Sequence, residues 1–86
     1  MTKLSDLPNI GAHAEQQLTE VGVATAEDLL ALGAEQAWLK VQTIDPGVCL
    51  HMLYALEGAV QGIPKKELDS ARKQELKDFM AANQPA

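Results

Sequence analysis

Glycine and proline interrupt this 86-residue chain at regular intervals, and the pieces between them have the length of short helices. The interruptions are Pro8-Asn9-Ile10-Gly11, Gly22, Gly33, Asp45-Pro46-Gly47 and Gly62-Ile63-Pro64. Within the pieces, apolar residues recur at helical spacing, as Ala14, Leu18 and Val21 do. The pattern predicts an all-α fold, a single small bundle of five helices.

The ends of these helices follow from capping residues. The expected ranges are about 12–21, 26–32, 34–44, 46–61 and 69–82. Thr25 and Asp28 are placed to cap the second helix, and Asp45 followed by Pro46 is placed to begin the fourth. The fourth helix is apolar in nearly every direction, which predicts a central position. Gly58 in its interior costs about 1 kcal/mol relative to alanine, so we expect a neighbouring helix to approach closely there.

Chain length and composition restrict the class of protein. A chain of this size buries only roughly 60 to 65% of its unfolded surface, so the whole chain, residues 1–86, is expected to be one domain with frayed ends at 1–5 and 83–86. Aromatic residues make up only 3% of the sequence, and a core of Leu, Ala and Val favours closely packed small helices over a β-sandwich. A multi-domain enzyme is excluded.

Charge and cysteine content point to a cytoplasmic protein without a cofactor. The formal net charge is −5, with two Lys against eight Asp and Glu in residues 1–64 and a net +1 in residues 65–86. The single cysteine, Cys49, forms no internal disulfide, and Cys49 and His51 are two residues apart on a helix, so they do not share a face for a metal. No export segment or membrane span is apparent. No catalytic motif or small-molecule site is evident, so we expect no enzyme activity.

The loop that precedes the first helix is the most informative motif. Leu7-Pro8-Asn9-Ile10-Gly11 turns backbone N–H groups outward beside a positive helix end, an arrangement suited to phosphate. It resembles a helix-hairpin-helix element, in which the loop reads roughly Leu-Pro-Gly-Ile-Gly, but here Asn9 replaces the first glycine and Glu15 follows without a basic residue. The candidate phosphate contacts are Asn9, Ile10, Gly11, Ala12 and His13. The acidic balance disfavours DNA, so the alternative is a purely structural loop.

Three stretches together resemble the C-terminal domain of the TfoX/Sxy family of competence regulators. They read LPNIG, EVGV-T-EDLLALGAEQAWLKV and PGV-L-MLYALEGAVQGI, and the similarity extends from about Leu4 to Met80. The resemblance implies an all-helical bundle of the helix-hairpin-helix or SAM-like type and a link to competence and transcription regulation. Longer members of the family carry an N-terminal α/β domain ahead of this one. We expect that whatever this domain contributes to function either comes from another chain or is not needed by this protein. The resemblance transfers no ligand or catalytic residue.

We therefore expect a non-catalytic interaction module whose partner is a protein, either a second copy in a homodimer or a different chain. Because so small a bundle cannot bury every large apolar side chain, the surplus is expected to form the interface, namely Trp38, Met52, Tyr54, Phe79 and Met80. Packing of Trp38 in the core is the alternative for that residue. Glu57, within the apolar fourth helix, either faces solvent or is buried and tied to a backbone N–H or a basic residue of another helix.

Overall fold

The computed structural model describes residues 2–84, and within them the chain forms five α-helices, two 3₁₀ helices and no strands. The elements are η1 (Leu4–Asp6), α1 (Ala12–Glu20), α2 (Ala26–Leu32), α3 (Ala34–Gln42), α4 (Leu50–Gln61), η2 (Lys65–Glu67) and α5 (Ser70–Ala82). The predicted all-α class with five helices is confirmed. None of the helices within residues 2–84 combines the length and the hydrophobicity that crossing a lipid bilayer requires.

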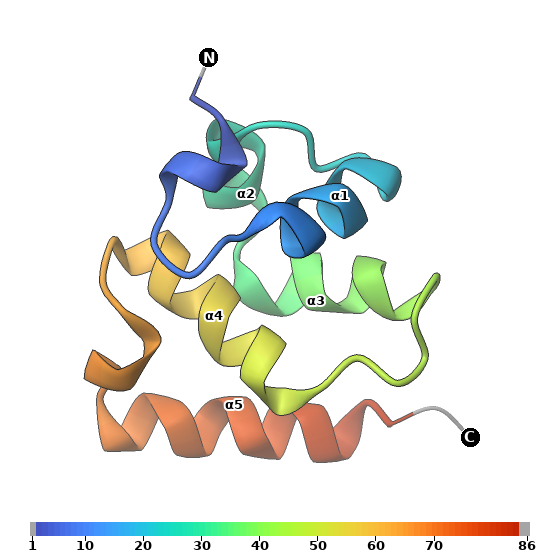
Figure 1. Ribbon diagram of the computed structural model, residues 1–86. Coiled ribbons are helices and arrows are strands. Elements are labelled where there is room, and N and C mark those ends of the chain that lie inside the picture. Colours follow the sequence, from blue (N-terminus) through green and yellow to red (C-terminus); the bar gives the residue numbers. More distant parts are fainter. Residues whose placement is uncertain (1, 85–86) are drawn as a thin grey trace.

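The helices are arranged as a small stack. Figure 1 shows α1 and α2 on one side, α5 on the other, and α3 and α4 between them. α4 packs against α3, α5 and η2, while α3 also packs against α1 and α2. The predicted central position of the most apolar helix is therefore confirmed, because a helix that is apolar all round needs neighbours on several sides.

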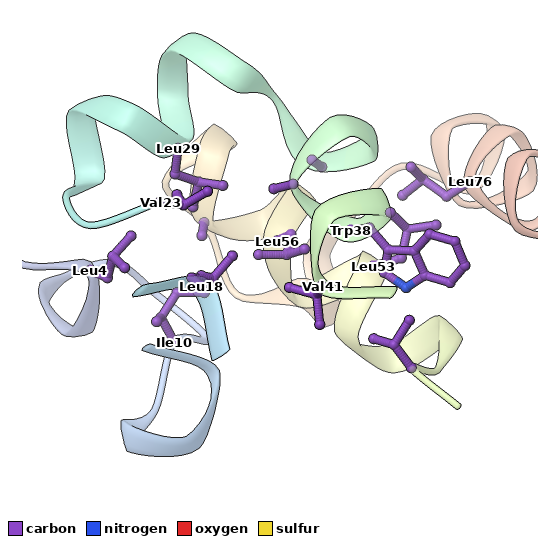
Figure 2. Packing of buried hydrophobic residues seen from close by; sticks show 14 of the residues in the cluster. Leu4, Ile10, Leu18, Val23, Leu29, Trp38, Val41, Leu53, Leu56 and Leu76 are labelled. Atoms are coloured by element: carbon purple, nitrogen blue, oxygen red, sulfur yellow. The ribbon is translucent and has the colours of Figure 1, made fainter. Parts of the chain in front are cut away.

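The core is formed by large aliphatic side chains and one tryptophan. Figure 2 shows side chains from most of the elements converging on it. The fully buried members include Leu4, Leu18, Leu29, Trp38, Leu53, Leu56 and Leu76. Trp38 also donates a hydrogen bond from Nε1 to the carbonyl of Cys49, at 3.1 Å, and meets the edge of Phe79 with ring centroids 6.2 Å apart.

Side-chain capping explains where α2 and α5 begin. Thr25 Oγ1 accepts a hydrogen bond from the N–H of Asp28, and the Asp28 carboxylate accepts one from the N–H of Thr25, which is the predicted capping box. Asp69 caps α5 by accepting from Ala71 N–H. The fourth helix differs from the prediction. It begins at Leu50, because Asp45 instead accepts from the N–H groups of Gly47 and Val48 and closes a turn.

The N-terminal segment is more ordered than the sequence predicts. Within the segment expected to be frayed, Leu4 is fully buried and Thr2 is tied to α2. The carbonyl of Thr2 accepts from Ala26 N–H at 2.9 Å, and its N–H donates to the Glu27 carboxylate. At the other end, the Asn83 carbonyl accepts from Gln42 Nε2 at 2.8 Å. The remaining predicted frayed residues, 1 and 85–86, lie outside the described residues.

Candidate functional site

The loop between η1 and α1 has the backbone that the motif predicts. Asn9 adopts φ 70°, the left-handed conformation that glycine usually supplies, and it is the one non-glycine residue with positive φ in the described chain, residues 2–84. Asparagine tolerates this conformation better than other non-glycine residues. The loop therefore keeps its shape although the first glycine of the helix-hairpin-helix pattern is absent.

The side chain of Asn9 faces the protein. Its Nδ2 donates to the carbonyls of Ile63, at 3.0 Å, and Ala55, at 3.4 Å, and its Oδ1 accepts from Lys65 N–H at 3.0 Å. These three hydrogen bonds join the loop to α4 and to the segment that leads into η2. Asn9 thus braces the fold, and its amide has little hydrogen-bonding capacity left for a ligand.

Gly58 allows this brace to fit. A Cβ on Gly58 would lie 2.7 Å from the carbonyl oxygen of Ile63 and would overlap Nδ2 of Asn9. The sequence predicts close approach at Gly58, and the structure confirms it. The approaching group is not a neighbouring helix as expected but the Asn9 side chain and the backbone of residues 63–65.

The other predicted loop residues differ in exposure. Ile10 is buried and contributes to the core, whereas Gly11, Ala12 and His13 are exposed at the start of α1. The Glu15 carboxylate lies close by, because it accepts a hydrogen bond from Ser5 N–H at 3.1 Å. Sequence reasoning missed Lys65, which is 56 positions from Asn9 in the chain but in direct contact with it. The loop therefore has both an acidic and a basic neighbour.

A small groove lies beside the loop, between the starts of α1 and α4. It has a volume of about 250 Å³, and its lining includes His13, Asp45, Cys49 and Met52. Asp45 accepts a hydrogen bond from Gln17 Nε2 at 3.1 Å. Within residues 2–84, no three His, Cys, Asp or Glu side chains converge closely enough to hold a metal ion. Cys49, which the sequence places in the core by default, is exposed.

The structure places the five predicted interface residues in different surroundings. Trp38 is fully buried, so it is unavailable to a partner, and core packing is the correct reading for it. Tyr54, Phe79 and Met80 are half-buried against the core, as is Met52. Met52 lines the groove beside α1, whereas Phe79 packs from α5 against Trp38. The bundle buries its large side chains better than the sequence predicts, because the layers cover α4 from both sides.

The most exposed large apolar side chains are two that the sequence places in the core. Leu30, on α2, is 50% exposed, and Ile44, after α3, is 44% exposed. In α2 the buried positions are Ala26 and Leu29, and Leu30 is turned about 100° from Leu29. Periodicity in so short a helix does not distinguish a position at the edge of the buried side from one outside it.

Glu57 is buried and paired, which is the second of the two alternatives that the sequence leaves open. Its Oε1 lies 2.9 Å from Nη2 of Arg72 in α5, and its Oε2 accepts from Gln61. Arg72 also pairs with Glu35 of α3 at 2.9 Å and with Glu75 at 3.2 Å. One guanidinium therefore links α3, α4 and α5.

The pKa of Glu57 reflects a balance of opposing effects. Burial raises this pKa, but the hydrogen bonds from Arg72 and Gln61 and the charge of Arg72 outweigh burial, so the net pKa lies below its ordinary value of 4.5. The hydrogen bond to Glu57 raises the pKa of Arg72, which stays charged at every pH at which the protein is folded. Glu57 and Arg72 are therefore both ionised at neutral pH, and their pair acts as a structural link.

Comparison with known proteins places this fold in a family. The sequence profile of the TfoX C-terminal domain matches residues 1–80. Protein Sxy of Escherichia coli K12 is 40% identical over 77 residues, which are 90% of this chain and 37% of that protein. The DNA transformation protein TfoX of Haemophilus influenzae Rd is 30% identical over 76 residues, 88% of this chain and 35% of that protein. The chain thus spans about a third of the length of these relatives.

Two crystal structures of proteins from Listeria monocytogenes are similar throughout. One, described as an uncharacterized protein, has a TM-score of 0.91 and 43% identity and covers 99% of this chain and 100% of its own. The other, described as a protein of unknown function, has a TM-score of 0.89 and 47% identity and covers 91% and 96%. With a profile match over nearly its whole length and relatives of this identity, the chain belongs to the TfoX C-terminal domain family.

Proposed function

We propose that this chain is a non-catalytic protein-interaction domain that acts in the regulation of competence and transcription, in the cytoplasm. The link to competence is supported by its similarity to a protein named for DNA transformation. The absence of catalysis is part of the proposal. Two observations support a non-catalytic role. The Asp45 carboxylate in the groove beside α1 already accepts a hydrogen bond from Gln17. That groove, at about 250 Å³, is smaller than most ligand sites, which are roughly 300 to 1,000 Å³.

The observation that carries the choice of a protein partner is the orientation of Asn9. The Asn9 side chain, which stands where the motif has glycine, faces inward and is used in three hydrogen bonds to α4, Ile63 and η2, so it offers nothing to a phosphate. The Glu15 carboxylate near the same loop repels phosphate. A loop that braces the bundle leaves recognition to other surfaces.

Deleting the gene in the bacterium that encodes this chain is expected to lower both the transcripts of DNA-uptake genes and the transformation frequency. A regulator that acts through a partner changes transcription of its targets without processing a substrate. The readouts are quantitative transcript measurement and colony counts after DNA addition, with Ile44→Ala complementation as a control for an exposed, fold-neutral change. Unchanged transcripts and transformation would contradict the competence link.

The second candidate function is DNA binding through residues 9–13, and Lys65 is the observation in its favour. Its backbone N–H donates to Asn9, and its exposed side chain adds a basic residue next to a loop that has none in its own sequence. This candidate predicts saturable binding to duplex DNA that weakens steeply as salt rises.

A titration of the purified chain with short duplex DNA, at low and moderate salt and with the mass read by light scattering, separates the two functions. We expect no saturable binding, because the first 64 residues carry a net charge of −6. Gly11→Val is the matched variant, since a Cβ at Gly11 meets no atom within 4 Å and the fold is kept. Salt-sensitive binding that this variant abolishes would favour the DNA-binding function instead.

A further inference from the structure

The exposed side of α2 combines an apolar residue with acidic ones. Its exposed residues are Glu27, Asp28, Leu30 and Ala31, which we call the α2 face. Leu30 is 50% exposed, the largest exposed fraction among the large apolar side chains of residues 2–84. Covering a leucine at this exposure would remove apolar surface from water, which favours association with a partner.

A groove borders the α2 face on the side of α3. It has a volume of about 260 Å³, with Val23, Ala31 and Leu32 as its apolar lining and Asp28 and Lys40 as its polar residues. This volume fits one large side chain and is small for a complete organic ligand. The groove is thus suited to hold the anchor residue of a partner protein, with Leu30 beside it as a second contact.

The charge around the α2 face is mainly negative, although Lys40 lines the groove. Residues 4–39 contain six Asp and Glu and no Lys or Arg. Only Glu35 of these six is paired with a basic side chain, since the ion pairs found within residues 2–84 all involve Arg72. The other five carboxylates, on η1, α1 and α2, form no ion pair with a lysine or arginine within residues 2–84, and their net negative charge attracts a cationic partner and repels nucleic acid.

We infer that the α2 face and the groove beside it form a docking surface for a basic amphipathic helix of a partner protein. The apolar side of such a helix places one aliphatic or aromatic anchor in the groove and a second apolar residue on Leu30. Its lysines and arginines face the carboxylates of α1 and α2. A helix is about 10 Å wide, which is enough to cover α2 and the groove together. This inference rests on the proposed function as a protein-interaction domain.

The test uses a fluorescent 18-residue peptide of leucine and lysine, with leucines at i, i+3, i+4 and i+7, titrated with the purified chain by anisotropy. We expect saturable binding that weakens with salt, and none with the counterpart in which glutamate replaces lysine. Leu30→Ala and Ala31→Trp are each expected to weaken binding at least about tenfold, by removing a contact and by filling the groove. Both positions are exposed, so both variants keep the fold.

Two comparisons between matched variants separate docking at the α2 face from a general attraction between opposite charges. Ile44→Ala removes an apolar side chain of similar exposure elsewhere and is expected to leave binding within about twofold, as expected for a residue outside the contact. Glu20→Lys, at the end of α1 next to the groove, is expected to weaken binding more than Glu67→Lys in η2, which changes the net charge equally. Equal effects within either pair would overturn the inference.

A second copy of the chain is the other occupant that the experiment detects. If light scattering shows that the free chain is a dimer and that Leu30→Ala makes it a monomer, the proposal of a basic partner helix is wrong. The α2 face is then the interface between two copies of this chain. The deletion experiment tests the competence link separately from the peptide titration. If the deletion changes nothing but the peptide binds, the proposed role in competence is wrong and the docking surface stands. If the deletion lowers transformation but the peptide does not bind, only the docking surface is wrong.

Discussion

Gly58→Ala is expected to destabilise the domain by about 3 kcal/mol or more, and to lower Tm by roughly 15 °C or more. In an exposed helix the same change would stabilise by up to about 1 kcal/mol, because alanine is the better helix former. Here the new Cβ would lie 2.7 Å from the carbonyl oxygen of Ile63 and would displace Asn9. Displacement breaks the three hydrogen bonds of the Asn9 amide, two of which are to part-buried carbonyls. Thermal and urea unfolding followed by circular dichroism measure the effect.

Gly11→Ala is the matched control for this prediction. A Cβ at Gly11 meets no atom within 4 Å, and its φ of −90° suits any residue. We expect a loss of about 1 kcal/mol or less, because Gly11 is the N-cap of α1 and alanine is a poorer N-cap than glycine. If Gly58→Ala is as stable as the unaltered chain, Asn9 does not occupy the position described here.

Arg72→Met is expected to destabilise the domain by about 2 to 3 kcal/mol. The substitution leaves the carboxylate of Glu57, which is 7% exposed, without its cation, and it removes the link from α5 to Glu35. The expected effect is smaller than for a fully buried pair because the Arg72 side chain is 27% exposed. Urea unfolding at pH 7 gives the value.

The double variant Glu57→Gln/Arg72→Met controls for the unpaired charge. It is expected to be more stable than Arg72→Met alone, since glutamine keeps the shape of Glu57 and carries no charge. A double variant less stable than the single one would show that the loss comes from packing of the arginine stem and not from the ion pair.

The same pair makes stability depend on pH. Because the pKa of Glu57 in the folded state lies below its ordinary value of 4.5, its contribution to stability is fully present above that value and is lost as pH falls through the folded-state pKa. Acid unfolding below about pH 4.5 is therefore expected to be steeper in the unaltered chain than in Arg72→Met. Parallel pH profiles would show that Arg72 does not hold this carboxylate.

Much of the fold follows from local sequence signals. The capping box of Thr25 and Asp28, the cap at Asp69 and the breaks at Gly22, Gly33 and Gly62 are found where the sequence predicts them. These features depend on residues that are close in the chain. The start of α4 was misplaced because Asp45 has two local options, a helix cap or a turn, and their energies differ too little for local sequence to decide.

The candidate sites could be predicted only in part. The loop of residues 9–13 was found from its motif, but the inward orientation of Asn9 depends on the carbonyls of Ala55 and Ile63, far away in the chain. The predicted interface was based on the size of apolar side chains, and Trp38 proved to be core. The α2 face was missed because Leu30 fits the buried periodicity of a seven-residue helix nearly as well as its neighbours do.

The sequence by itself determined the all-helical class and the order of the helices, because helix propensity, capping and apolar spacing act over a few residues. The family followed from the resemblance of three stretches to the TfoX C-terminal domain. The tertiary structure alone decided what Asn9, Gly58, Glu57 and Leu30 do. The first three are defined by partners that the fold brings together: Asn9 and Gly58 share one space, and Glu57 meets Arg72 from another helix. Leu30 differs from them, because half of its surface is left exposed by the fold. Which side chains come together depends on how the layers stack, a property of the whole chain that no local segment carries.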